Sequence, residues 1–144
     1  MRACYTAEIG VQEATGNNDG QRVAAYLRYC GLNEGYEWCA AFVSWCHGQA
    51  GSSEPRNAWA AALFPTTKTI DPAVTSPRAG DVFGIYITSK KRIGHCGFVD
   101  KWEGDWVVTV EGNVNNAVVR KRRSVKTLAA VSRWHNAEPG TPQM

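Results

Sequence analysis

The sequence lacks a long apolar run. None of its 144 residues belongs to an uninterrupted stretch of the about 18 apolar residues that a membrane-spanning helix needs. The first residues, Met1 to Glu8, also lack the apolar core of a secretory signal. We therefore expect a chain with no membrane span and no signal peptide, made in the cytoplasm, that reaches any outside substrate by another route.

The cysteines do not form a metal-binding pattern. There is no Cys-x-x-Cys pair, and Cys39 and Cys46 are too far apart for a usual zinc knuckle. We therefore expect no structural metal. Five cysteines are an odd number, so at least one is unpaired within a monomer. Disulfides among Cys4, Cys30, Cys46 and Cys96 would need an oxidising compartment, and the sequence leaves them open.

Charge of neither sign is in large excess. The net charge of +3 and the pI near 8.7 favour an anionic polymer but are too small to name one. Nucleic-acid binding is not expected, because no recognised binding motif accompanies this modest pI. The basic run Arg120 to Arg123 lies on a predicted strand, where we interpret its charges as protecting an exposed strand from pairing. Attraction to an anionic polymer is the functional alternative.

The composition is that of one folded domain. The chain is 44% hydrophobic and 20% charged, and a chain of this length buries roughly 70% of its unfolded surface. No internal repeat or linker divides it. We expect residues 1–136 to form a single domain and residues 137–144, which include Pro139, Gly140 and Pro142, to form a flexible tail.

Helical and strand patterns occupy different halves of the chain. Helices are predicted at Ala3–Gln12, at Gln21–Cys30, from Cys39 to a stop at Gly51, and at Asn57–Phe64. Residues 65–79, with three prolines, are predicted as a loop. Strands are predicted at Asp81–Ile87, Ile93–Trp102, Trp106–Glu111, Val118–Val125 and Leu128–Trp134. Helices followed by an antiparallel meander indicate an α+β fold.

Cys39 is the candidate nucleophile. It follows a glycine-containing turn and begins a helix whose apolar stripe includes Phe42, Val43 and Cys46. Free backbone N–H groups at a helix start stabilise a thiolate over a thiol, and the thiolate is the reactive form. The alternative interpretation is that Cys39 is a small buried residue, as most unpaired cysteines are.

His95 is the candidate base. The chain has three histidines, and His47 lies eight residues after Cys39, about 12 Å along the same helix. His135 follows the last predicted strand, next to the tail. His95 lies between two glycines within a strand. Such glycines usually mean that another part of the structure, here the helix carrying Cys39 or a substrate chain, must approach closely. A core histidine is the alternative, but the chain offers no better base.

A third group must fix the tautomer of His95. Its strand is predicted to turn at residues 103–105, and the return strand carries Glu111 and Asn113. A three-residue loop places one of these two opposite His95 and both on its face of the sheet. A two-residue Glu-Gly loop would instead place Gly112 opposite His95 and turn Glu111 away. The glycine in the turn favours a three-residue loop with a bulge.

Four motifs occur in order along the chain. They are Trp38-Cys39-Ala40-Ala41-Phe42-Val43, Arg78-Ala79-Gly80-Asp81-Val82, Gly94-His95-Cys96-Gly97-Phe98-Val99 and Val110-Glu111-Gly112-Asn113. In this order they resemble the CHAP domain, the cysteine- and histidine-dependent amidohydrolases and peptidases of the papain-like NlpC superfamily. The resemblance runs from about Tyr5 to Trp134. It implies a papain-like α+β fold, with N-terminal helices packed on a C-terminal antiparallel sheet.

The resemblance also implies a reaction. Cys39 would attack an amide carbonyl, His95 would relay the proton, and Glu111 with Asn113 would orient the imidazole, with no cofactor. Which of Glu111 and Asn113 is the main orienting residue is left open. The implied substrate is bacterial peptidoglycan, cut either at the N-acetylmuramoyl-L-alanine amide or within its peptides. The implied settings are a phage endolysin or an interbacterial toxin. A toxin would be bound by an inhibitory immunity protein. The acidic calcium-binding loop of some members is absent, so no metal is expected.

Two further functions compete with wall hydrolysis. One is a wall-binding module that kept the fold and lost turnover. The other is a papain-like amidase that acts on a protein. Tyr36 and Trp38 adjoin Cys39 and are candidate substrate contacts, although aromatic residues near a helix start more often belong to the core. We expect a monomer.

Overall fold

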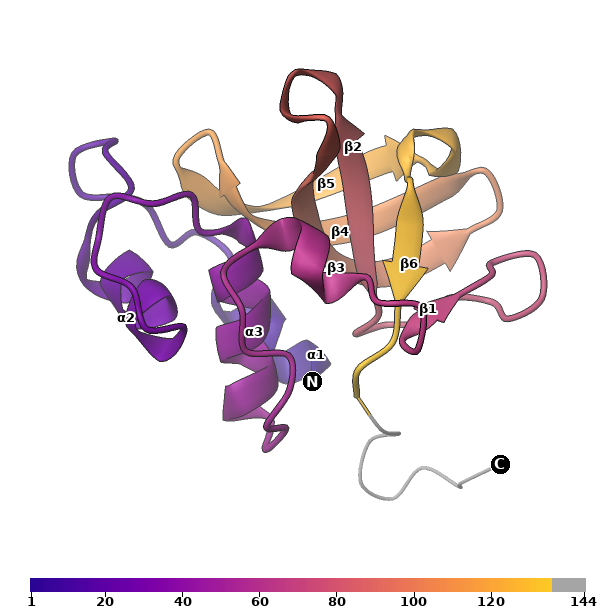
Figure 1. Cartoon of the computed structure of the whole chain (residues 1–144), viewed down its shortest axis with the longest axis horizontal. Helices are drawn as coiled ribbons and strands as arrows, with labels where there is room; N and C mark the ends of the chain where they lie inside the picture. Colours follow the sequence, from indigo (N-terminus) through magenta and orange to yellow (C-terminus); the bar gives the residue numbers. More distant parts are fainter. Residues whose placement is uncertain (136–144) are drawn as a thin grey trace.

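Three α-helices precede the sheet in the chain. They are α1 (Arg2–Ala7), α2 (Gln21–Tyr29) and α3 (Cys39–Gln49), followed by a short 3₁₀ helix, η1 (Ala60–Leu63). The computed structural model describes residues 1–135, so the predicted tail 137–144 lies outside the described residues. The helices gather on one side of the molecule, and α3 lies between α2 and the sheet (Figure 1). Within residues 1–135, no helix has the length and apolar character to cross a membrane.

Six antiparallel strands form the sheet. They are β1 (Thr69–Ile70), β2 (Val82–Ile87), β3 (Arg92–Glu103), β4 (Trp106–Val114), β5 (Ala117–Ser124) and β6 (Ala130–Ser132). Their order is β1-β6-β2-β3-β4-β5. The predicted α+β class, with N-terminal helices packed on a C-terminal antiparallel sheet, is confirmed. The predicted meander is corrected at one edge, because β6 returns to pair with β2. β1, which pairs with β6, lies in the segment predicted as a loop.

The first predicted helix is shorter than its pattern suggested. α1 ends at Ala7, and Gly10 has a φ of 99°, which a helix cannot contain. The chain then runs alongside β5: the Gly10 N–H donates to the Val118 carbonyl, and the Val118 N–H donates to the Val11 carbonyl. Tertiary pairing therefore overrides the helical periodicity between Glu8 and Gln12. The helix predicted at Asn57–Phe64 is likewise reduced to η1.

The main core lies between the helices and the sheet. Phe98 of β3 stacks on Tyr5 of α1 with ring centroids 4.5 Å apart, and Phe42 of α3 meets it edge-on at 5.8 Å. At Gly112, α3 comes so close to β4 that an added Cβ would lie 2.8 Å from the Trp38 ring and 2.9 Å from Phe42 Cβ. This glycine therefore lets α3 pack directly on β4, which fixes where the helix begins relative to the strands.

The hairpin of β3 and β4 sets which side chains share a face. Glu103 pairs with Trp106, so the turn has two residues, Gly104 and Asp105, and the predicted three-residue loop is corrected. On its own, this turn would place Glu111 and His95 on different faces of the sheet. The register shifts between Val99 and Lys101, however, because one extra residue bulges out of β3 there. Phe98 then pairs with Val110, which restores the predicted sharing of faces.

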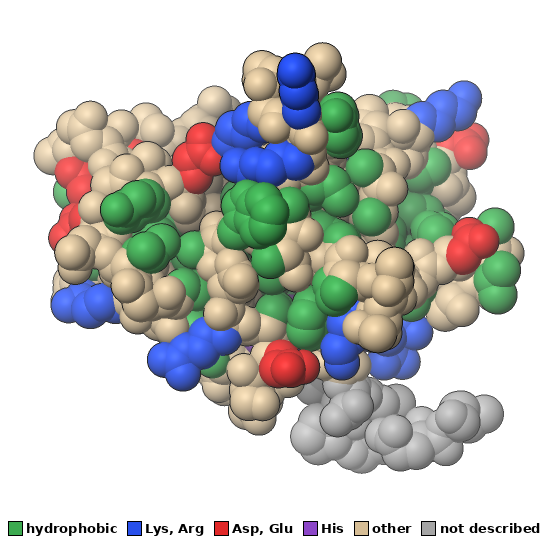
Figure 2. All heavy atoms as spheres, in the orientation of Figure 1, with side chains coloured by type: hydrophobic (Ala, Val, Ile, Leu, Met, Phe, Trp, Pro, Cys, Tyr) green, Lys and Arg blue, Asp and Glu red, His purple; other side chains and the backbone are tan. Residues whose placement is uncertain are grey.

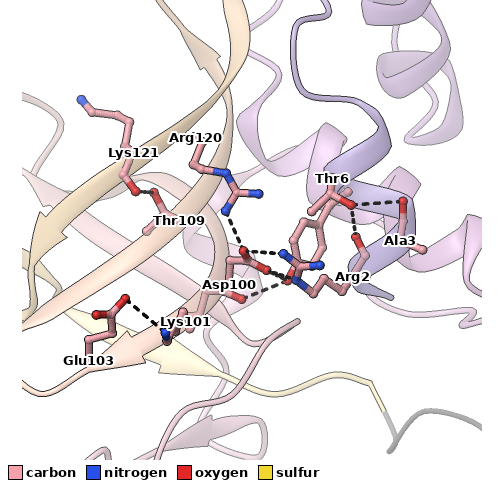
Figure 3. Close-up of polar contacts among 11 residues, drawn as sticks. Arg2, Ala3, Thr6, Asp100, Lys101, Glu103, Thr109, Arg120 and Lys121 are labelled. Atoms are coloured by element: carbon pink, nitrogen blue, oxygen red, sulfur yellow. Dashed lines mark hydrogen bonds and ion pairs between the residues drawn. The ribbon is translucent and has the colours of Figure 1, made fainter.

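The bulging residue, Asp100, is held by side chains of two other elements, α1 and β5 (Figure 3). Its carboxylate accepts hydrogen bonds from Arg2 at 2.8 Å and from the Tyr5 hydroxyl at 2.6 Å, both on α1. Arg120 of β5 donates from the other side at 2.7 Å. Burial would raise the pKa of Asp100, but these donors lower it below its ordinary value. The bulge is thus anchored by contacts to α1 and to β5.

Candidate active site

Cys39 is the first residue of α3. The Trp38 carbonyl accepts the first helical hydrogen bond, from the Phe42 N–H at 2.9 Å, so the N–H groups before Phe42 have no partner within the helix. Cys39 is only 4% exposed. Its sulfur is therefore largely desolvated and lies at the positive end of the helix dipole, where a thiolate is favoured.

His95 and Glu111 form a hydrogen-bonded pair. The Nε2 atom of His95 lies 2.8 Å from Oε1 of Glu111, whose side chain is fully buried. Because Nε2 carries the proton toward the carboxylate, Nδ1 remains for the contact that His95 makes with Cys39. Burial lowers the pKa of His95, but the hydrogen bonds to Cys39 and Glu111 outweigh it and raise that pKa to about 9.

Gly97 makes room for this pair. It lies two residues after His95 on the same face of β3, and a Cβ added there would lie 2.9 Å from Cγ of Glu111 and 2.9 Å from the Phe83 ring. A side chain at this position would therefore push the carboxylate away from the imidazole. The glycine that follows His95 in the sequence thus serves the approach of Glu111, rather than that of a helix or a substrate chain.

The electrostatics of Cys39 favour ionisation. A hydrogen bond from the Cys96 thiol, followed by the hydrogen bond and charge of His95, lowers the pKa of Cys39 well below its ordinary value despite burial. Burial raises the pKa of Cys96, so this second thiol keeps its proton and donates it to the sulfur of Cys39. The result is a thiolate–imidazolium pair with a buried carboxylate behind the imidazolium.

Glu111 has partners that the sequence reasoning did not identify. Arg123 of β5 donates to both carboxylate oxygens, and the Thr109 hydroxyl donates to Oε2 at 2.5 Å. Burial raises the pKa of Glu111, but these bonds and the one from His95 lower it to about 2. Thr109 could have been found from strand alternation, since it lies two residues from Glu111 on the same face. Arg123 had no such local signal.

The other three predicted site residues, Asn113, Tyr36 and Trp38, lie in different environments. Asn113 has a φ of 62° at an irregularity of β4, and within residues 1–135 no hydrogen bond joins it to the His95 ring. Of the two orienting residues left open, Glu111 is the one in contact with the imidazole. Tyr36 is 55% exposed and can meet a substrate. Trp38 is fully buried and its indole N–H donates to Glu13, so its prediction as a substrate contact is corrected: the side chain belongs to the core.

The other histidines lie in different environments. His47 is buried in α3, with Nδ1 2.9 Å from the Val43 carbonyl and its ring stacked on Phe98. Burial lowers the pKa of His47 to about 4, so it is neutral in the core. His135 lies 3.5 Å from the Asp81 carboxylate. Within residues 1–135, no group of three or more His, Cys, Asp or Glu side chains could hold a metal ion.

The ionisation of Cys39 can be measured without a substrate. At pH 6, Cys39 should react with iodoacetamide about 10–100-fold faster than a free cysteine, because an ordinary thiol is almost fully protonated there. Peptide mass spectrometry after timed quenching identifies the labelled residue. Burial raises the pKa of Cys30, so this partly exposed thiol is an internal slow reference. Equal labelling of Cys30 and Cys39 at pH 6 would contradict the ion pair.

Comparison with known structures shows the fold. A crystal structure of Ly7917, described as containing the hydrolysing product of MDP, matches with a TM-score of 0.55 and 14% sequence identity over 92% of this chain. A second crystal structure of Ly7917 matches with a TM-score of 0.52 and 16% identity over 91% of this chain. The chain spans 61% and 59% of the lengths of those two chains. A search of curated proteins found no match.

Comparison with family models identifies the family. The model of the CHAP domain matches residues 31–113, a segment that contains the start of α3 and the strands bearing His95 and Glu111. It covers more than half of the chain, and the resemblance noted in the sequence is confirmed. The chain therefore belongs to the CHAP domain family.

Proposed function

We propose that this chain is a cysteine-dependent hydrolase of peptidoglycan. The observation that carries the proposal is the alignment of Cys39, His95 and Glu111: a desolvated sulfur at a helix start, an imidazole in contact with it, and a buried carboxylate 2.8 Å behind the imidazole. This is the arrangement of a nucleophile, a base and an orienting group. Membership of the CHAP family supports the same reading.

The reaction divides into two steps. The Cys39 thiolate attacks the amide carbonyl carbon, and the imidazolium of His95 gives its proton to the departing amine, which leaves a thioester. Water, deprotonated by the neutral imidazole, then attacks the thioester and releases the acid, which regenerates the Cys39 thiolate and leaves the proton from water on His95. Backbone N–H groups at the start of α3 are placed to receive the oxyanion in both steps, at roughly 3 kcal/mol for each donor.

The substrate class follows from the family and from one neighbour. The similar Ly7917 structure is described as holding the hydrolysing product of MDP, and this is a statement about that protein. For this chain we propose an amide of peptidoglycan, either the N-acetylmuramoyl-L-alanine bond or a bond within the peptides. A phage endolysin and an interbacterial toxin both fit such a site, and the toxin would require an immunity protein that covers it.

A cavity lined in part by the loop that leads into α3 offers a place for the rest of the substrate. Its volume is about 510 Å³, and its walls include Tyr36, Glu37, Arg56 and Trp59, although neither Cys39 nor His95 is among the described residues that line it. Tyr36 and Trp59 are each 55% exposed. Exposed rings of this kind can pack against a sugar or an extended peptide. We propose that this cavity holds the part of the substrate next to the scissile amide.

The rim of this region is basic. Lys90 at the tip between β2 and β3 pairs with Glu37, and Arg92 lies over the Trp59 ring at 5.6 Å. Figure 2 shows Lys and Arg side chains gathered over this projecting tip, above a group of hydrophobic side chains. Together with the net charge of +3, this favours approach to an anionic wall polymer.

The proposal extends to the organisation and location of the protein. We propose that residues 1–136 act as one catalytic domain, as a monomer and without a cofactor. We also propose that the chain is made in the cytoplasm and reaches the wall by release or secretion. Its substrate would then lie in the periplasm or outside the cell.

Digestion of purified peptidoglycan tests the function. The protein should release new amino groups from sacculi, and mass spectrometry of the soluble muropeptides identifies the bond that is cut. The Cys39→Ala variant is the matched control. Equal release by both proteins would end the proposal. Binding to sacculi without turnover would favour a wall-binding module, and thiol-dependent cleavage of a protein by an enzyme inert on sacculi would favour a protein amidase.

A further inference from the structure

The carboxylate of Glu111 is held more completely than an orienting group requires. Its Oε1 atom lies 2.8 Å from Nε2 of His95 and accepts from one terminal nitrogen of Arg123 at 2.7 Å. Its Oε2 atom accepts from Nε of Arg123 at 2.6 Å and from the Thr109 hydroxyl at 2.5 Å. Each oxygen thus has two partners, and the carboxylate cannot rotate without breaking several bonds at once.

Arg123 reaches Glu111 along one face of the sheet. Glu111 pairs with Val119 across β4 and β5, and Arg123 lies four residues further along β5, opposite Val107. The side chain therefore extends back past Thr109 to form a two-bond fork with the carboxylate. Arg123 is 21% exposed, while Glu111 is fully buried.

The neighbouring arginines on β5 do something else. Arg120 binds the Asp100 carboxylate, and Arg122 lies over the Trp106 ring at 4.1 Å on the exposed side. The basic run is therefore not one patch. Its members alternate between the two faces, and only Arg123 among them contacts the residues of the candidate active site.

We propose that Arg123 is a positioning residue of the active site. It acts through Glu111, because it keeps that carboxylate ionised and fixes its plane. The fixed carboxylate holds the Nε2–H tautomer of His95, so that Nδ1 faces the Cys39 sulfur. The inference rests on the proposed roles of Cys39, His95 and Glu111, and it extends the orienting machinery by one residue on another strand. The groups that face Glu111 are His95 from β3, Thr109 from β4 and Arg123 from β5, and its charge also raises the pKa of Cys96 on the other face of β3.

The fork gives Arg123 two separable properties. Its charge balances a carboxylate that would otherwise be buried beside an ionisable ring, and its planar geometry fixes the direction of both oxygens. Lysine at this position would keep the charge and lose the fork. Glutamine would lose the charge. A comparison of the two variants therefore shows whether geometry or charge is the main contribution.

Absorbance of the thiolate near 240 nm, followed from pH 4 to pH 10 in the full chain, is the first readout. In the unaltered protein the thiolate signal should span a broad range of pH. In Arg123→Gln, Glu111 loses both forked bonds and His95 loses a fixed partner. The range should then narrow from its acidic side only, because a neutral imidazole does not protonate the sulfur, with the midpoint of Cys39 rising by about one pH unit. Arg123→Lys should lie between the two.

Turnover on peptidoglycan is the second readout. Arg123→Gln should lower kcat by about 10–100-fold with little change in KM, because a small misplacement of the imidazole affects the reacting geometry rather than substrate binding. Ethylguanidinium added in solution should restore part of kcat. Arg122→Gln, the exposed neighbour, is the matched control and should retain both kcat and the thiolate range.

Specific outcomes would overturn the inference. They are an unchanged thiolate range and kcat in Arg123→Gln, or losses no larger than those of Arg122→Gln. A third is a fall in thermal stability in both Arg123 variants while the folded fraction keeps its full kcat, since this would make Arg123 a structural residue only. The absorbance readout uses no wall substrate. Failure of the enzyme on sacculi therefore tests the proposed function, and not this one.

Discussion

Replacing Cys39 with alanine should reduce the release of amino groups from peptidoglycan by about four orders of magnitude or more. The reason is that the variant loses the nucleophile and retains only the contribution of binding and oxyanion stabilisation. Cys96 cannot take its place, because burial raises its pKa and leaves a protonated thiol. Initial rates on purified sacculi, measured by labelling of new amino groups, provide the test.

The loss should come without unfolding. Alanine removes one buried sulfur from a residue that is 4% exposed, which should lower the free energy of unfolding by only about 1 kcal/mol. Urea unfolding of both proteins checks this. Cys4→Ala, at a partly buried thiol on α1, is the matched control and should keep full activity. Substantial hydrolysis by Cys39→Ala would show that another group performs the attack.

Replacing Glu111 with glutamine should lower kcat by about 10²–10⁴-fold. The substitution keeps the volume and removes the charge, so Arg123 loses its counter-ion and His95 loses the acceptor that fixes its tautomer. The imidazolium is also less stable, and the pKa of His95, now about 9, should fall toward its ordinary value. In the profile of kcat/KM against pH, the basic limb should therefore move to lower pH.

The same substitution should change how stability depends on acid. The pKa of Glu111 is about 2 in the folded chain and 4.5 ordinarily, so its ionised form stabilises the fold above about pH 4.5. This contribution, about 3 kcal/mol, is lost as the pH falls through 2. Glu111→Gln should lack that part of the acid transition. Glu103→Gln, on the exposed end of the same hairpin, should behave like the unaltered protein.

The sequence was sufficient to predict the class of fold and the members of the central pair. Cys39 follows a turn signal at the head of an apolar helix, and the structure begins α3 at that residue. His95 stood out because the two other histidines were badly placed for Cys39. Both arguments use local patterns and chain distances, which an isolated sequence contains.

Register was harder to predict, because it depends on contacts between distant segments. The face of Glu111 was predicted from a three-residue turn, whereas the structure reaches the same face with a two-residue turn and a bulge at Asp100. That bulge is held by Arg2, Tyr5 and Arg120, none of which lies in the hairpin. No pattern within residues 92–114 indicates them.

Side-chain direction at the start of α3 was not predictable either. Tyr36 and Trp38 are two residues apart, but Tyr36 is exposed while Trp38 is buried with its indole bonded to Glu13. Arg123 was assigned to a protective basic strand because its partner is 12 residues away on another strand. Long-range pairing of this kind follows from the fold, and the sequence contains it only implicitly.

The separation of 16 residues between His95 and Glu111 restricts how this hairpin can evolve. With a two-residue turn, an even separation puts two residues on the same face only if one strand carries an extra residue, as β3 does at Asp100. A single insertion or deletion in this hairpin would move the Glu111 side chain to the other face of the sheet, unless a bulge was gained or lost at the same time. Relatives that keep this chemistry should therefore differ in hairpin length by pairs of residues, or by one residue together with one bulge.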